Sequence, residues 1–145
     1  MDSTNHTSTY TIWEGSRNRI QARDYEISPE LKYTWESAER TGKQGPVDGV
    51  DVIATYTSED TEKIILVANF RPPNGKFCIG FPAGRIEPDE DPRACGLREL
   101  KEETGYTATL DEITYVSKAG NGDPWKSNES SLFIKAHIDK TRPEN

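Results

Sequence analysis

The chain has 145 residues, a length that suits one domain burying about 68–70% of its unfolded surface. Its 25 acidic and 18 basic residues give a net charge of −7 without any basic run, which argues against nucleic acid as a partner. Hydrophobic residues make up 32%, a thin supply that favours a partner surface, and no stretch approaches the roughly 18 apolar residues of a membrane span. The N-terminus lacks the apolar core of a signal peptide, so neither secretion nor a membrane partner is expected.

The two cysteines, Cys78 and Cys95, indicate reduced, buried thiols rather than a disulfide or a zinc site. The chain has only two histidines, so a histidine metal site is not expected either. We therefore expect a cytoplasmic protein, with the nucleus as the alternative location.

The first part of the chain is predicted to form strands. Residues 1–8 are polar and are expected to precede the first strand without regular structure. Alternation of apolar and polar residues predicts strands at 9–13, 20–27 and 32–40, followed by a loop at 41–46. In the third strand, Tyr33 and Trp35 fall on one side, so this strand is expected to expose aromatic rings.

The second part of the chain indicates a sheet around one long helix. Strands are predicted at 47–57, 63–70, 77–82, 107–116 and 131–138, with a polar loop at 117–130. The nearly continuous apolar run of 63–70 is typical of a buried central strand. Many strands around one helix indicate an α+β domain.

The helix signals lie between Asp91 and Gly105. Asp91 is a favourable N-cap, Pro92 fits the first helical position, and Gly105 is a typical C-terminal stop. These signals predict a helix at 92–104. At about 100° per residue, one side of it carries the apolar residues Ala94, Leu97 and Leu100.

The other side of this helix gathers three carboxylates, Glu99, Glu102 and Glu103. They lie in the C-terminal half, where the helix dipole disfavours anions, and their like-charge spacing costs roughly 0.2–0.5 kcal/mol per pair. A divalent cation would offset both costs, and an oxygen-only cluster suits Mg²⁺ or Mn²⁺. From these residues alone, a solvated acidic face is the alternative.

The spacing around the helix resembles a known family motif. Gly84 is followed after five residues by Glu90, and after seven more by the run RELKEETGY at 98–106. This resembles the Nudix box, G-x5-E-x7-R-E-U-x-E-E-x-G-U with U bulky and apolar, and Tyr106 serves as the last U. The resemblance implies a hydrolase with the Nudix fold, an α+β mixed sheet sandwiched by helices, here with an N-terminal antiparallel strand region.

Further stretches resemble the ADP-ribose or ADP-sugar pyrophosphatase branch of this superfamily. They are TWESAERT at 34–41, DGV at 48–50, NFRPPNGKFCIGFPAGRIE at 69–87 and ELKEETGYTA at 99–108. The resemblance implies Mg²⁺-dependent hydrolysis of the diphosphate bond of ADP-ribose or a related ADP-sugar, giving AMP and a sugar phosphate, in a homodimer. Residues 1–145 are expected to form a single Nudix domain. Within it, about 9–46 would serve dimerisation and substrate binding, and about 47–145 would form a core that is short at its C-terminal end.

The resemblance also assigns metal and catalytic residues. The implied ligands of Mg²⁺, with Mn²⁺ as the alternative, are Ala83 through its carbonyl, Glu99, Glu103 and, as a shared or outer ligand, Glu102. Arg98 matches the box arginine that orients carboxylates; it is four residues from Glu102 and within reach of Glu90. Glu90 is interpreted as an outer residue, with a plain surface charge as the alternative.

Substrate-binding residues follow in the same way. Arg40 and Arg71 match arginines that contact the diphosphate, for which a planar guanidinium fork is suited. Trp35 matches an aromatic residue that stacks on adenine. Arg17 stands where the resemblance implies a second stacking tryptophan; stacking by its guanidinium plane and a looser recognition of the base are the two alternatives.

The resemblance also offers a candidate catalytic base. The loop 123–129 resembles the segment S-P-G-x-S-x-E, with Trp125 in place of glycine, and makes Glu129 the candidate base; a surface carboxylate is the alternative. Relatives continue past the position of Asn145 with an acidic loop, a strand and a helix. Two alternatives stay open. Arg17 motivates a Nudix hydrolase for another nucleoside diphosphate derivative, and the absence of the family's C-terminal segment motivates a shortened inactive form that binds a nucleotide or a partner.

Overall fold

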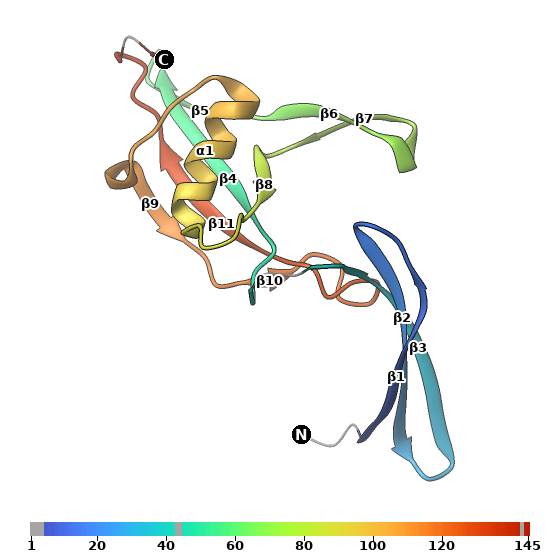
Figure 1. Cartoon of the computed structure of the whole chain (residues 1–145). Coiled ribbons are helices and arrows are strands. Elements are labelled where there is room, and N and C mark those ends of the chain that lie inside the picture. The colour runs from blue at the N-terminus through green and yellow to red at the C-terminus, as the bar shows by residue number, and fades with distance from the viewer. Residues whose placement is uncertain (1–4, 43–44, 143) are drawn as a thin grey trace. The chain divides into compact units, whose positions relative to one another are not determined.

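The computed structural model describes residues 5–42, 45–142 and 144–145. The chain divides into two compact units (Figure 1). The first contains Met1–Pro46 and Asn121–Glu129, and the second contains Val47–Gly120 and Ser130–Asn145.

The first unit is an antiparallel sheet in the order β1-β2-β3. Its strands are β1 (Asn5–Glu14), β2 (Asn18–Ser28) and β3 (Leu31–Arg40). All three predicted strands are present and are longer than predicted. Residues 5–8 belong to β1 rather than preceding it, which corrects that part of the prediction; residues 1–4 lie outside the described residues. Polar residues can form the start of β1 because their backbone pairs with β2. At Ser8, for example, the side-chain hydroxyl also donates to Asp24 at 2.7 Å.

The loop at 121–129 belongs to the first unit because it bonds to β3. The Ala38 amide donates to the Lys126 carbonyl at 2.7 Å, and Ala38 forms a parallel bridge with Ser127. On the sheet, the carboxylate of Glu39 is 4% exposed and is bonded by Arg19 and Arg23. Two guanidinium groups thus balance a buried negative charge.

The second unit contains a mixed sheet in the order β10-β11-β4-β5, with β8 paired to β4 and β9 paired to β11. Its strands are β4 (Gly49–Ser58), β5 (Thr61–Ile64), β8 (Ala83–Arg85), β9 (Ile113–Val116), β10 (Gly120–Asn121) and β11 (Ser130–His137). β11 runs parallel to β4, while β9 pairs antiparallel with β11, and β5 and β8 pair antiparallel with β4. The predicted mixed sheet is confirmed.

Helix α1 (Pro92–Thr104) packs on this sheet over β4, β8 and β11 (Figure 1). Both predicted ends are confirmed: the Asp91 side chain accepts from the first free amides, and Gly105 is the C-cap with a φ of 79°. In the described residues α1 is the single α-helix, beside two short 3-10 turns, η1 (Pro72–Asn74) and η2 (Leu110–Glu112). No helix there is long and apolar enough to cross a membrane.

The buried side of α1 differs from the prediction by one position. Leu100 is buried as expected, but Ala94 is exposed and Cys95 and Gly96 face the core instead. A methyl group at Gly96 would lie 3.0 Å from the Ile134 side chain, so the missing side chain lets the helix approach the sheet. The pattern missed this because glycine carries no apolar side chain to mark a buried position.

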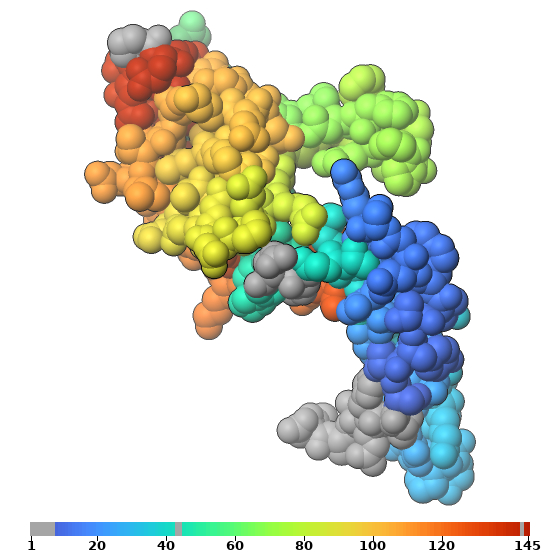
Figure 2. Space-filling view, in the orientation of Figure 1, coloured from blue at the N-terminus to red at the C-terminus, as the bar shows by residue number. Residues whose placement is uncertain are grey.

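The run 63–70 does not form the buried central strand that was predicted. It divides between β5 and β6 (Val67–Arg71), and within the described part of the chain β6 pairs with β7 (Lys76–Gly80) alone, in a two-stranded hairpin. Figure 2 shows this hairpin, in green, standing out from the rest of its unit. Phe77 and Ile79 are 70% and 75% exposed. Apolar content predicted burial, but β5 is an edge strand and the chain leaves the sheet after it.

Four smaller corrections concern two predicted strands, the loop at 117–130 and one cysteine. The predicted strand 77–82 is present as β7 but ends at Gly80, and β8 begins only at Ala83. The predicted strand 107–116 is strand only from Ile113, because η2 with its Thr109 capping box precedes it. The loop 117–130 contains β10. Both cysteines are free as predicted, but only Cys95 is buried; Cys78 on the hairpin is half-buried.

Leu100→Ala is expected to lower the free energy of unfolding by about 3 kcal/mol, because it leaves a cavity in a fully buried site. Urea denaturation followed by circular dichroism measures this. Leu110→Ala, at a position 54% exposed, is the matched control and should change stability by less than about 0.5 kcal/mol. Equal effects of the two substitutions would contradict the packing described for α1.

Candidate active site

The carboxylate of Glu99 lies directly against the backbone of Gly84. A Cβ added to Gly84 would be 1.8 Å from the carboxyl carbon of Glu99 and 2.0 and 2.3 Å from its oxygens. The carboxylate therefore occupies the space that any other residue at position 84 would fill. This explains why the stretch before the helix requires glycine here.

Glu103 lies one helical turn after Glu99 and is bonded to Ala83, the residue before Gly84 in β8. Its carboxylate accepts the Ala83 amide at 3.0 Å and the Asn69 side-chain amide at 3.1 Å. The structure records the Ala83 N–H at this position, while the predicted role of its carbonyl as a metal ligand stays a prediction. Two adjacent residues of β8 thus contact these carboxylates, Gly84 that of Glu99 and Ala83 that of Glu103.

Arg98 organises the acidic side chains from the other side. It donates to both oxygens of Glu90 at 2.8 and 2.9 Å, to Glu99 at 2.6 Å and to Glu102 at 3.5 Å. The predicted reach of Arg98 to Glu90 and Glu102 is therefore present. These hydrogen bonds raise the pKa of Arg98, first through Glu90 and, after the opposing effect of desolvation, through Glu99.

Glu90 is not an isolated surface charge. Its side chain is 16% exposed, and its carboxylate also accepts the Glu87 amide at 2.9 Å. The hydrogen bond from Arg98 is the main cause that lowers the pKa of Glu90 from 4.5 to about 2. The anion is stabilised in the folded state by its arginine partner.

Glu102 differs from the other two helix carboxylates. Its side chain is 60% exposed, and it pairs with Arg98 at 3.5 Å. Among the described residues, no three acidic, histidine or cysteine groups converge closely enough to form a complete metal-binding set. The oxygens of Glu99 and Glu103 beside β8 nevertheless suit a hard divalent cation, with Glu102 farther out on the same helix.

The first unit brings together two other predicted site residues. Arg40, the last residue of β3, donates from Nε to the carboxylate of Glu129 at 2.5 Å. The Trp35 indole donates to the Trp125 carbonyl at 2.8 Å. The carbonyl of Arg17 accepts the Thr41 amide at 3.1 Å, which fixes the backbone of Arg17 near the start of β2.

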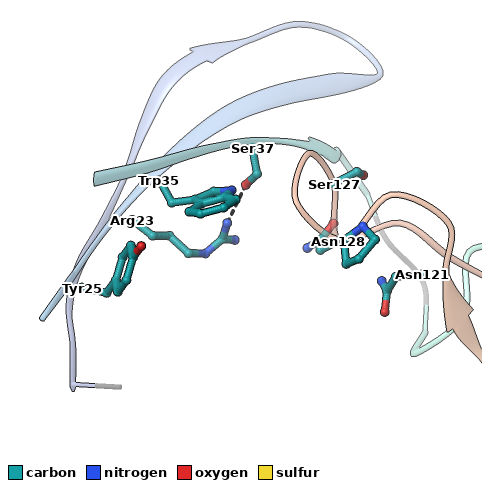
Figure 3. A pocket seen from close by; sticks show the side chains of 8 residues that line it. Arg23, Tyr25, Trp35, Ser37, Asn121, Ser127 and Asn128 are labelled. Atoms are coloured by element: carbon teal, nitrogen blue, oxygen red, sulfur yellow. Dashed lines mark hydrogen bonds between the residues drawn. The ribbon is translucent and has the colours of Figure 1, made fainter. Parts of the chain in front are cut away.

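A pocket of about 550 Å³ lies in the first unit. It contains Trp35 but not Arg17 or Arg40. Figure 3 shows aromatic and arginine side chains of β2 and β3 on one side and the loop residues on the other. The lining residues are Arg23, Tyr25, Trp35, Ser37, Asn121, Pro124, Ser127 and Asn128.

Sequence reasoning missed Arg23 and Tyr25 in this pocket. Arg23 lies opposite Trp35 in the pairing of β2 with β3 and donates to the Ser37 hydroxyl at 2.7 Å. The centroids of the Tyr25 and Trp35 rings are 6.4 Å apart. The register of β2 against β3 would have identified both. Single strands considered one at a time do not contain that information.

Arg71 belongs to the second unit, at the exposed end of β6, and Asn69 is two residues before it on the same strand. Asn69 was also missed, although it stands in the stretch NFRPP that was used for the branch resemblance. The structure thus groups Arg71 with the helix carboxylates in one unit, and Trp35, Arg40 and Glu129 in the other.

A family model described as the NUDIX domain matches residues 46–144, which is more than half of the chain. The chain therefore belongs to the Nudix family. Proteins of this family generally act with a divalent metal ion, and the glutamates described above lie within the matched residues.

Individual relatives agree with this family. The chain is 40% identical over 134 residues to a mouse protein named ADP-sugar pyrophosphatase, covering 91% of this chain and 60% of that protein. It is 38% identical over 116 residues to a Saccharomyces cerevisiae protein named ADP-ribose pyrophosphatase, covering 77% and 48%. The chain thus spans about half to three fifths of the length of these relatives.

A solved structure described as an ADP compounds hydrolase matches with a TM-score of 0.70 at 19% identity, covering 95% of this chain and 69% of that one. At this identity the match concerns the fold, and it confirms the predicted Nudix α+β architecture.

The Arg98–Glu90 pair makes stability depend on pH. Because the pKa of Glu90 is lower in the folded chain, its contribution is present above pH 4.5 and is lost as the pH falls toward 2. The Tm of wild type should therefore exceed that of Glu90→Gln at pH 7, and the difference should shrink below pH 4.5. Differential scanning fluorimetry measures this, with Asp89→Asn as the control in the same turn. A Tm difference that is constant with pH would contradict the role of this pair.

Proposed function

We propose that this chain hydrolyses the diphosphate bond of ADP-ribose or a related ADP-sugar in the presence of Mg²⁺, giving AMP and a sugar phosphate. The proposal rests on three contacts. The Glu99 carboxylate lies against the backbone of Gly84, the Glu103 carboxylate accepts the Ala83 amide, and Arg98 donates to Glu99. The names of the mouse and yeast relatives support the substrate class.

The proposed ligands of the cation are the carboxylates of Glu99 and Glu103, with Glu102 as a shared or outer ligand and the Ala83 carbonyl completing the set. Mg²⁺ suits these oxygen ligands, and Mn²⁺ is the alternative. When bound, a divalent cation would neutralise charge on the diphosphate and lower the pKa of a water molecule.

The protein side chains have separate proposed roles. Arg98 orients Glu99 and Glu102 by the hydrogen bonds described above. Arg71 in the second unit and Arg40 in the first are proposed to bind diphosphate oxygens with their guanidinium forks.

Base recognition is assigned to the first unit. Trp35 offers a stacking surface for adenine in the 550 Å³ pocket. Arg17, which does not line this pocket, stays the predicted second stacking group. Water attacks phosphorus, the bridging P–O bond breaks, and a base accepts the proton of the water. The sequence suggests Glu129 for that base, a role that stays a prediction.

Glu103→Gln is expected to lower the kcat for ADP-ribose by about 100-fold or more, because a neutral amide is a poor ligand for a hard cation. The measurement is AMP release with and without Mg²⁺, followed by chromatography. Glu87→Gln, at an exposed carboxylate before the helix, is the control and should retain wild-type turnover. Release of AMP by the variant at the wild-type rate would refute the assignment.

A substrate panel separates this function from its alternatives. Faster turnover of UDP-glucose or diadenosine polyphosphates than of ADP-ribose would indicate a Nudix hydrolase for another nucleoside diphosphate derivative, an alternative motivated by Arg17. Nucleotide binding without any turnover would indicate the inactive binding form.

We further propose a homodimer through the N-terminal strands, which keeps residues 1–145 as one Nudix domain with about 9–46 serving the interface. Tyr10, Ile12 and Trp13 on β1 are each at least half exposed, an apolar surface that a second copy would cover. The proposed partners are thus a small nucleotide sugar and a second copy, with no role for nucleic acid or membrane. The free thiols suit a reducing compartment, and the cytoplasm is proposed on that basis.

Light scattering coupled to size exclusion at micromolar concentration should give twice the mass of the 16.3 kDa chain. Ile12→Glu, which places a charge in the proposed apolar interface, should shift the mass toward one chain. A wild-type monomer at this concentration would contradict the dimer.

A further inference from the structure

The loop Asn121–Glu129 is tied to β3 at three points. The carbonyl of Trp125 accepts a hydrogen bond from the Trp35 indole at 2.8 Å, and the carbonyl of Lys126 accepts one from the Ala38 amide at 2.7 Å. The carboxylate of Glu129 accepts one from Nε of Arg40 at 2.5 Å. Two residues that are proposed to bind substrate, Trp35 and Arg40, are therefore held by the same loop.

The contact of Glu129 with Arg40 has a specific geometry. The bond to Glu129 uses Nε, one of the five N–H groups of a guanidinium, and the fork of the two terminal nitrogens is a separate part of the side chain. That fork is the part of arginine that meets two phosphate oxygens at once. Both side chains are partly exposed, at 29% for Arg40 and 44% for Glu129, so a ligand can reach the pair.

Glu129 is itself fixed by the loop. Its amide donates to the Ser127 hydroxyl at 3.0 Å, and its carbonyl accepts the Asn121 side-chain amide at 3.0 Å. The backbone on both sides of the carboxylate is thus restrained, and a restrained acceptor restrains the guanidinium that donates to it.

We infer that Glu129 is a positioning residue for Arg40, in place of the base role that the sequence suggested. The carboxylate holds Nε so that the terminal nitrogens of Arg40 face the diphosphate of the substrate. The inference rests on the proposed function, because it takes Arg40 to bind that diphosphate. One oxygen of Glu129 is already committed to the guanidinium, which is the reason for preferring this role.

The test compares Glu129→Ala with Glu129→Gln, using ADP-ribose and Mg²⁺. The alanine variant should raise KM about tenfold with kcat changed less than about threefold, because Arg40 loses a charge-assisted acceptor. The glutamine variant retains an oxygen that can accept from Nε, so its KM should stay within about threefold of wild type and its pH profile of kcat should be unchanged.

Two controls separate positioning from general damage. Glu26→Gln removes another carboxylate–cation pair of the first unit, with Lys32 at 3.5 Å, and should leave KM unchanged. The ¹⁵N resonance of the Arg40 Nε–H group, assigned with Arg40→Lys, should move in Glu129→Ala and stay near its wild-type position in Glu129→Gln.

Two outcomes would overturn the inference. A large loss of kcat in Glu129→Gln, together with loss of the acidic limb of the pH profile, would make Glu129 the base. A lower KM in Glu129→Ala would show that the carboxylate competes with the diphosphate for Arg40 instead of aiming it.

If wild type neither binds nor hydrolyses ADP-ribose, the proposed function fails, and calorimetry with inorganic pyrophosphate judges the role of Glu129 separately. Weaker pyrophosphate binding by Glu129→Ala than by Glu129→Gln supports positioning. Equal affinities of the two variants overturn it.

Discussion

The close approach of Glu99 to Gly84 is the constraint on which the candidate active site depends. It requires α1 to lie deep against β8, and Gly96 makes this possible on the core side because an added methyl group would crowd Ile134. Leu100 fills the core beneath. Once the helix is seated in this way, helical geometry places Arg98 beside Glu99 and Glu103 one turn after it, and hydrogen bonds from Ala83 and Asn69 hold the Glu103 carboxylate. The same packing that builds the core therefore positions the carboxylates, and stability and the site share one set of contacts.

Both units solve the same electrostatic problem by similar means. An acidic chain that holds carboxylates close together must neutralise them locally, and arginine does so with several donors at once. In the second unit Arg98 joins Glu90, Glu99 and Glu102, and in the first unit two arginines enclose the buried carboxylate of Glu39. These hydrogen bonds stabilise the carboxylates in their charged form and also fix their orientation.

The sequence predicted what depends on local chemistry and failed where distant segments decide. The ends of α1 were predictable because Asp91 and Gly105 act on their own helix, and the N-terminal strands because alternation is a property of each strand. The run 63–70 was misassigned because burial depends on which strands pair with it. Asn69 and Arg23 were missed for the same reason, since each acquires its role from a partner far along the chain, Glu103 for one and Ser37 for the other.

The hairpin of β6 and β7 has a consequence for Glu103. One hydrogen bond to this carboxylate comes from the sheet, through Ala83, and the other comes from the hairpin, through Asn69. The side-chain conformation of Glu103 thus depends on two elements, strand β8 of the mixed sheet and the separate two-stranded hairpin of β6 and β7. A binding event that bends this hairpin would therefore change the hydrogen bond from Asn69 to the Glu103 carboxylate, although the binding takes place outside the sheet.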